Sequence, residues 1–513
     1  MTGRTIPLTL ITTVLVVVPL ASAVAIDFRW SSQAEPSTLD PHAAATAPVL
    51  GFLNNVYEGL VRRAPDMRLE PSLAVAWEPI GDQGWRFRLR EGVRFQDGAT
   101  FDADDVIFSY ERASSDVSDV KAWFSTIDRV EAPDSLTVEF YTTQPDPLFP
   151  SGIANWMIMD RGWTEAIGAE LPSRDTQSAA TFEANGTGPF RVVTRNPDVT
   201  TTLQRFDGWW DTLPVLETAT FKPLASDATR VAALLSGEVD LIEPVPLQDV
   251  PKLERAADVS VITGVESRVI FFGFDHLNDG PLTDPLVREA IYRTLDADAI
   301  VATIMRGQAQ AAGLLIGPGV QGYRPDDDQR LPTDRDAARG LLAEAGHGDG
   351  FPLRLRCPND RYVNDEAICT AAIGMLRQIG IDASLDAVPV SVYWDELRAG
   401  RFDMYLLGWS PGTFDAEHPI RFLLHSPDPE RRLGSWNFGG FTDADIDALL
   451  PRIQREIDPV ARQAMLDEVH ARMRERVAYV PMHVQPLVWA VRAPFTAVQR
   501  PDNFLILRWI GVR

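Results

Sequence analysis

The order of predicted elements in residues 334–407 constrains the fold more than any other part of this chain. Three strands, predicted for residues 353–357, 383–388 and 402–406, alternate with three helices. The expected first residues or caps of these helices are Asp334, Asn364 and Ser391, and the glycines that end them are Gly346, Gly380 and Gly400. Strands that alternate with helices at this spacing form a parallel sheet covered by helices. We therefore expect an α/β fold.

A second pattern, typical of antiparallel strands, occupies residues 85–140. Trp85, Phe87 and Leu89 alternate with arginines, and a turn signal follows at residues 97–98. Asp102 is placed to cap the next helix, and residues 136–140 read as another strand. A helix is also predicted for residues 49–60, and strands for residues 26–30, 488–491 and 504–507. The last two strands must join a sheet that forms earlier in the chain.

Length and charge limit the number of domains and the classes of partner. A chain of 513 residues is too long for one hydrophobic core, so two to four domains are expected. The formal net charge is -24. Such a surface repels phosphate backbones and anionic lipids, which argues against binding to nucleic acid or to a membrane surface.

The N-terminus has the three parts of a secretory signal peptide. Arg4 precedes an uncharged apolar run at residues 6–20, and small-x-small cleavage sites follow at residues 21–23 and 23–25. A membrane anchor is the alternative, but the run is shorter than the ~20 residues that span a bilayer. We expect residues 1–25 to be a signal peptide, with cleavage after Ala23 or Ala25. Since no cysteine lies near these sites, a lipoprotein is not expected.

The chain has two cysteines, Cys357 and Cys369. Cys357 ends a predicted strand and Cys369 lies early in the helix that packs back on the sheet, so the two could meet. In an oxidising compartment such a pair is a candidate disulfide, with two buried free thiols as the alternative. Two cysteines cannot by themselves complete a closed zinc site, and no metal site is predicted.

Seven short motifs, spread over some 400 residues, identify a family that this chain resembles. They are STLDPH (37–42), VYEGLV (56–61), PSLAVAWE (71–78), LREGVRFQDG (89–98) with DDV (104–106), GTGPF (186–190), VREAI (287–291) and LGW (407–409). They resemble, in order, the peptide/opine/nickel-type (extracellular family 5) solute-binding proteins of ABC importers, including dipeptide- and oligopeptide-binding proteins.

The resemblance implies a fold like that of type II periplasmic binding proteins, with two α/β lobes joined by crossing strands. It places lobe I at residues 26–266, with an extra subdomain at about 61–182. Lobe II would span residues 267–485, and residues 486–513 would return to lobe I. The crossing strands are expected near residues 267–274 and 479–485.

The resemblance also implies a role. We expect a monomeric periplasmic protein without a cofactor, which binds a small solute, most often a peptide, and delivers it to an ABC transporter permease. Nickel chelates, opines and oligosaccharides are the alternative ligands. An exported hydrolase is a further alternative, but the chain has no His-Glu-x-x-His metalloprotease motif. We therefore expect no enzyme.

In relatives, a loop after a strand of lobe II presents an aromatic ring and a carboxylate to the ligand. Here the resemblance assigns these roles to Trp409 and Asp415, with Asp415 receiving a ligand ammonium. The alternative is that Trp409 packs in the core and Asp415 is a turn residue. The chain departs from dipeptide-binding relatives at Pro411 and Gly412, where an acidic residue is usual, and this puts the amine anchor in doubt.

Four further residues are candidates for ligand contact. Arg361 and Tyr362 match an arginine and a tyrosine that hold the peptide carboxylate in relatives. A solvated surface arginine is the alternative for Arg361. Glu35, near the end of the first strand, and Asn437 are weaker candidates. For a metal ligand, His418 and His425 are the histidines to examine.

Overall fold

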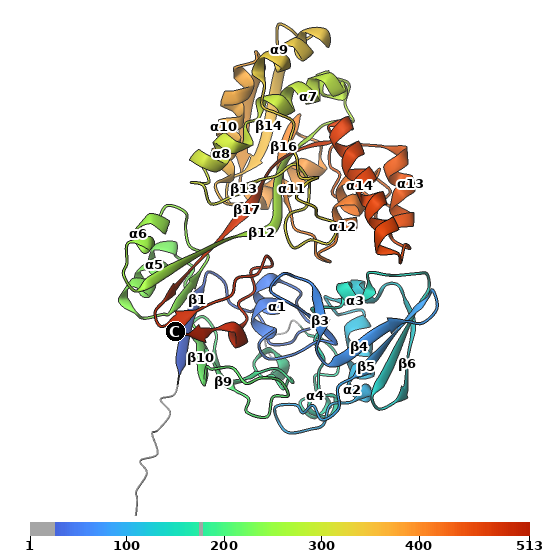
Figure 1. Cartoon of the computed structure of the whole chain (residues 1–513), viewed down its shortest axis with the longest axis vertical. Helices are drawn as coiled ribbons and strands as arrows, with labels where there is room; N and C mark the ends of the chain where they lie inside the picture. Colours follow the sequence, from blue (N-terminus) through green and yellow to red (C-terminus); the bar gives the residue numbers. More distant parts are fainter. Residues whose placement is uncertain (1–25, 174–177) are drawn as a thin grey trace, which may run out of the picture.

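The computed structural model describes residues 26–173 and 178–513, so the predicted signal peptide lies outside the described residues. Two lobes lie one above the other, joined by two long strands, β12 (Val259–Phe274) and β17 (Tyr479–Arg492) (Figure 1). The lower one, which contains the first strand, is lobe I here, and the upper one is lobe II. The segments predicted to cross between lobes are parts of these two strands.

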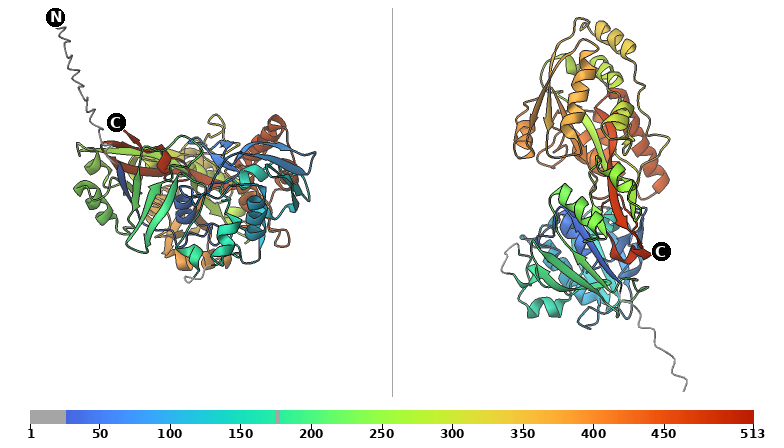
Figure 2. Two further views of the ribbon diagram at one scale, coloured as in Figure 1. Left: turned by 90° about the horizontal axis from the view of Figure 1, so that it is seen from below. Right: turned by 90° about the vertical axis from the view of Figure 1, so that its left-hand side faces the viewer.

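One mixed sheet passes through both lobes. Its order is β15-β14-β16-β12-β17-β11-β1-β10-β9-β8, with β13 paired to β17. The remaining strands of this sheet are β1 (Asp27–Ser32), β8 (Phe190–Asn196), β9 (Thr200–Arg205), β10 (Thr218–Phe221), β11 (Leu241–Glu243), β13 (Gln310–Ala311), β14 (Pro352–Pro358), β15 (Asp382–Val388) and β16 (Met404–Trp409). Because β12 and β17 pair with each other on both sides of a short interruption, the connection between the lobes is a two-stranded ribbon (Figure 2).

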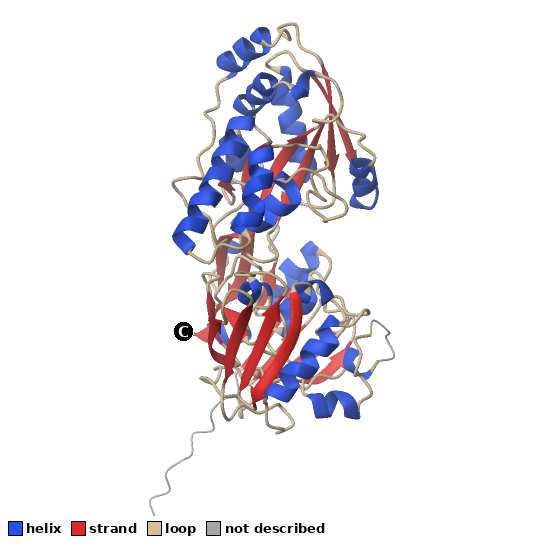
Figure 3. Cartoon of the chain, turned by 90° about the vertical axis from the view of Figure 1, so that its right-hand side faces the viewer, coloured by secondary structure: helices blue, strands red, loops and turns tan. Residues whose placement is uncertain are grey.

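Lobe II has the predicted parallel sheet, since β14 pairs in parallel with both β15 and β16. Helices pack against its strands (Figure 3). They are α7 (Pro285–Thr294), α8 (Ala297–Thr303), α9 (Arg335–Glu344), α10 (Asp365–Arg377), α11 (Val390–Arg398), α12 (Glu417–Pro419), α13 (Ala444–Ile453) and α14 (Pro459–Arg476). The alternation of strands and helices predicted for this region is therefore confirmed.

Two of the predicted helix caps differ from expectation. Asn364 occupies the predicted N-cap position of α10, but it has a positive φ of 57° and makes no capping bond through its side chain. The carboxylate of Asp365 instead accepts from the backbone N–H groups of Arg361 and Tyr362 at 2.9 Å. Ser391 lies inside α11, which begins one residue earlier, after Pro389.

Lobe I carries the predicted antiparallel strands as a separate four-stranded sheet, in the order β4-β5-β7-β6. These strands are β4 (Ala74–Pro79), β5 (Gly84–Leu89), β6 (Ile127–Asp134) and β7 (Thr137–Thr142). Asp102 caps α2 (Ala103–Ser114) in a capping box with Asp105, as its position predicts. A hydrophobic core of its own, including Phe87, Phe140 and Trp156, lies under this sheet.

Short elements complete lobe I. They are β2 (Val61–Arg63), β3 (Leu69–Pro71), α1 (Ala47–Leu53), α3 (Phe149–Gly152), α4 (Arg161–Ala166), α5 (Asp227–Ser236), α6 (Val250–Glu254), β18 (Phe495–Thr496) and β19 (Gly511–Val512). Helix α1 ends earlier than predicted, at Asn54, whose side-chain amide donates to the Leu50 carbonyl. Such local bonds compete with helix continuation.

The C-terminal segment agrees with the sequence only in part. Residues 488–491 belong to β17, as predicted. Residues 504–507 form no strand, although Phe504, Leu505 and Ile506 are buried in the core of lobe I. A short apolar run predicts that a segment is buried but does not distinguish a strand from other buried structure. Residues 504–506 are buried without pairing to a strand.

The disulfide between Cys357 and Cys369 is present, and it links the end of β14 to α10. The two predicted neighbours therefore do meet. Across residues 26–173 and 178–513, no helix has both the length and the apolar content needed to cross a membrane.

Candidate functional site

A cleft lies between the lobes, beside the ribbon formed by β12 and β17. Its volume is about 870 Å³, which falls in the range of small-molecule sites, roughly 300–1,000 Å³. Lobe I contributes the aromatic rings of Trp30, Phe52 and Phe221, and lobe II contributes residues 360–364. The cleft therefore has an apolar wall on lobe I and a polar loop on lobe II.

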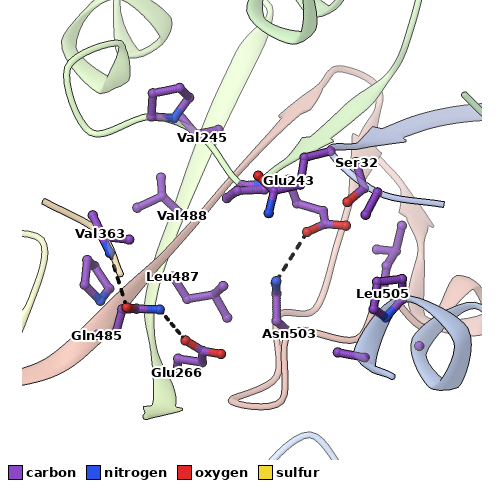
Figure 4. A pocket seen from close by; sticks show the side chains of 18 of the residues that line it. Ser32, Glu243, Val245, Glu266, Val363, Gln485, Leu487, Val488, Asn503 and Leu505 are labelled. Carbon is purple, nitrogen blue, oxygen red and sulfur yellow. Dashed lines mark hydrogen bonds between the residues drawn. The ribbon is translucent and has the colours of Figure 1, made fainter. Parts of the chain in front are cut away.

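The lobe I side is built at the carboxyl ends of two parallel strands. β1 and β11 run side by side, with Ser32 opposite Glu243, the last residue of each strand. Parallel strands direct such residues into the crevice at the edge of a sheet. Asn503, from the C-terminal segment, donates its side-chain amide to Oε2 of Glu243 at 3.3 Å (Figure 4).

Glu243 is a half-buried acid, and this environment changes its chemistry. Burial raises the pKa of its carboxyl to about 7, against the smaller opposing effects of hydrogen bonds from Ser32 and Asn503. Within the described residues, Glu243 makes no ion pair. This acid is therefore close to half-protonated near neutral pH.

A second polar group lies where the ribbon passes the cleft. Gln485 of β17 donates to Oε2 of Glu266 at 2.6 Å and accepts from the backbone N–H of Val363 at 3.4 Å (Figure 4). Arg268 pairs with the same Glu266 at 3.4 Å. These bonds tie the end of the lobe II loop, just before α10, to both crossing strands.

Arg361 and Tyr362, both predicted ligand contacts, line the cleft from lobe II. Tyr362 is buried, and its hydroxyl group donates a hydrogen bond to the Gly408 carbonyl at 3.4 Å. The guanidinium carbon of Arg361 lies 5.2 Å from the centre of the Tyr362 ring. Arg361 is exposed and makes no ion pair within the described residues. A planar guanidinium in this setting suits a carboxylate.

Trp409 is packed in an aromatic cluster and is not part of the cleft lining. Its indole Nε1–H donates to Nδ1 of His418 at 3.1 Å, and its ring contacts Phe422 and Trp436 at centroid distances of 5.7 and 5.5 Å. Burial lowers the pKa of His418 to about 4, so this acceptor nitrogen stays unprotonated at neutral pH. In this conformation Trp409 packs in the core of lobe II, which was the alternative to ligand contact.

Asp415 is also away from the cleft, in a buried ion pair. Its two carboxylate oxygens accept from Nη1 and Nη2 of Arg462 at 2.9 and 2.7 Å, and its side chain is 0% exposed. Arg462 comes from α14, so the pair joins the loop to the body of lobe II. Because its side chain is buried and its charge is already paired with Arg462, Asp415 is not accessible to a ligand ammonium in this conformation.

The two weaker candidates make structural hydrogen bonds. Asn437 is buried, donating to the carbonyls of His425 and Phe441 and accepting from the Phe441 N–H. Glu35 accepts from the backbone N–H of Asp198, in the turn between β8 and β9. Neither residue lines the cleft.

Sequence reasoning missed Glu243, Glu266, Gln485 and Asn503. One signal for Glu243 was available, because it directly follows residues 239–242, a short run with the character of a strand in an α/β lobe. The others depend on how β12, β17 and the C-terminal segment meet in space. In the part of the chain that the structure describes, no three His, Cys, Asp or Glu side chains form a metal-binding group.

A profile described as "Bacterial extracellular solute-binding proteins, family 5 Middle" matches residues 68–430. A curated relative, the glutathione-binding protein GsiB of Shigella dysenteriae, is 26% identical over 469 residues, covering 88% of each chain. The GsiB protein of Escherichia coli K12 matches equally well, with 26% identity and the same coverage.

Solved structures with the same fold extend the comparison. HbpA2 from Haemophilus parasuis has a TM-score of 0.84 at 20% identity, covering 95% of this chain and 100% of its own. DppA from Helicobacter pylori, in complex with the peptide STSA, has a TM-score of 0.73 at 22% identity, covering 95% and 98%. Together with the profile match over most of its length, these findings show that the chain belongs to family 5 of the bacterial extracellular solute-binding proteins.

Proposed function

We propose that this chain captures a small peptide in the cleft between its lobes and delivers it to the permease of an ABC importer. The observation that carries the proposal is the cleft itself, which joins an apolar wall to charged groups on opposite lobes. A peptide offers both an apolar side chain and two charged ends. The matched relatives support this ligand class, since their names and complexes include glutathione, a tetrapeptide and a nonapeptide.

The proposed mechanism is binding and closure, without a chemical step. We assign lobe I to residues 26–266, with the extra subdomain at about 61–182, lobe II to 267–485, and the return to lobe I to 486–513. Closure about the β12–β17 ribbon would bury the peptide, and the closed shape would be the one that the permease recognises. The signal peptide, release into the periplasm without a lipid anchor, and a monomeric state belong to the same proposal.

A thermal-shift screen of the mature protein tests the ligand class. The panel holds di- to pentapeptides, glutathione, opines, oligosaccharides, and nickel with and without histidine. A ligand at about 100 times its dissociation constant stabilises the folded state by about 2.7 kcal/mol, which gives a readable shift. Shifts with peptides are the expected result. Shifts only with sugars, opines or nickel would overturn the peptide proposal.

A further inference from the structure

Seven charged side chains line the cleft, and only some of them form ion pairs with described residues. Three acids already have an arginine partner: Asp227 with Arg230, Glu266 with Arg268, and Asp502 with Arg500. Asp360 is exposed and accepts from the backbone N–H of Val390. Among the described residues, Asp360, Arg361 and Glu243 therefore make no ion pair. Since Asp360 is exposed to solvent, Glu243 on lobe I is the half-buried acid, and Arg361 on lobe II the cation, that lack a charged partner.

The surroundings of Glu243 favour the binding of a cation from a ligand. Its hydrogen-bonding neighbours are Ser32 from β1 and Asn503 from the C-terminal segment. The positive charge that acts on its carboxyl, Arg230 of α5, is engaged by Asp227 and by the carbonyls of Leu224, Ala225 and Pro244. A half-buried carboxylate without a counter-charge is costly, and an incoming cation removes that cost.

The usual location for such an acid is unavailable here. Pro411 and Gly412 replace it in the loop after β16, and Asp415 is engaged by Arg462. Given a peptide ligand, as proposed above, we propose that Glu243 of lobe I receives the peptide's ammonium group, with the peptide carboxylate directed to Arg361 of lobe II. The binding mode thus places the ligand's two charges on opposite lobes.

This arrangement has a consequence for closure. A zwitterionic peptide bound to Glu243 and Arg361 together connects the two lobes, so it favours the form in which both contacts are made. A peptide without its ammonium group loses the lobe I contact. Charge on the ligand, as well as its apolar surface, therefore determines how strongly it binds.

The test compares trialanine, tetraalanine and glutathione with their N-acetylated forms, measured by isothermal titration calorimetry. Acetylation should weaken binding to the unaltered protein about tenfold or more, the range expected for losing a hydrogen bond between charged groups. Glu243→Gln should weaken binding of the free amines to a similar extent and leave the N-acetylated forms unchanged. The matched control is Glu254→Gln, an exposed acid on α6 outside the cleft, which should bind like the unaltered protein.

The pH dependence of peptide affinity provides a second test, because a variant that merely disturbs packing would not change that dependence. Since burial holds the pKa of Glu243 near 7, its carboxyl must lose a proton to pair with the ammonium at lower pH. Affinity for trialanine should fall as the pH drops from about 7 to about 5.5, by up to about tenfold per pH unit. The peptide amine stays protonated in this range. Glu243→Gln should remove this slope.

The outcomes separate the two proposals. If none of the free peptides binds the unaltered protein, the peptide function fails and the role of Glu243 fails with it. If they bind, but acetylation and Glu243→Gln have no effect, only the role of Glu243 is overturned. Circular dichroism of Glu243→Gln confirms that the variant compared is folded.

Discussion

At the scale of single residues, the same side-chain type has opposite roles according to its partners. Asp415 and Glu243 are both acids withdrawn from solvent in a solute-binding protein. Asp415 has a bidentate arginine partner, so removing it leaves a buried charge unpaired. Glu243 has no such partner, and this makes it available to a ligand. The difference predicts a loss of stability at one position and a loss of affinity at the other.

Asp415→Ala should therefore destabilise the protein by about 3–5 kcal/mol, the range for breaking a buried ion pair. Urea denaturation followed by tryptophan fluorescence measures this free energy of unfolding. The control is Asp395→Ala, which breaks an exposed pair with Arg398 and should cost less than about 1 kcal/mol. A stable Asp415→Ala protein with strongly reduced peptide affinity would instead restore the ligand-binding role first expected for Asp415.

At the scale of elements, a loop of lobe II touches a strand and a short helix of lobe I. Arg63, in β2, donates to the Thr413 carbonyl at 2.9 Å, and its guanidinium carbon lies 4.7 Å from the centre of the Phe414 ring. Ser151, in α3, donates to the same carbonyl at 2.9 Å. These contacts join the lobes at a distance from the ribbon, so they restrain how far the cleft opens.

Arg63→Ala and the milder Ser151→Ala should each give a more open ligand-free protein, because both remove a bond between the lobes. Small-angle X-ray scattering should show a larger radius of gyration for both variants. Arg62→Ala is the matched control, since the ion pairs that this neighbouring arginine makes with described residues are with Asp211 and Glu70, both in lobe I. Equal radii for all three variants would show that this contact does not restrain opening.

At the scale of the whole molecule, the sheet is continuous but irregular beside the cleft. The β12–β17 register shifts between Val265 and Val269, so Glu266, Ser267 and Arg268 leave the regular ladder. Ladder hydrogen bonds stiffen a ribbon, and an interruption is where it bends most easily. This position coincides with the cleft lining.

We expect a peptide that binds to compact the molecule, because closure about this interruption brings the lobes together. Scattering profiles with and without saturating peptide measure the change in radius of gyration. A cleft already closed in solution would give the same profile in both conditions, and that result would contradict a hinge mechanism.

The sequence by itself determined the fold class, the antiparallel sheet of lobe I, the capped helix at Asp102 and the candidate disulfide pair. Each of these depends on local periodicity or on two elements that are neighbours in the chain. The family motifs also led to Arg361 and Tyr362, which line the cleft.

Only the tertiary structure decided the rest of the site. Glu243, Gln485 and Asn503 come from segments up to 260 residues apart, and Asp415 meets Arg462 across 47 residues. Whether an acid is free for a ligand depends on whether a cation from a distant element reaches it first. That pairing is a property of packed side chains and leaves no local pattern in the chain.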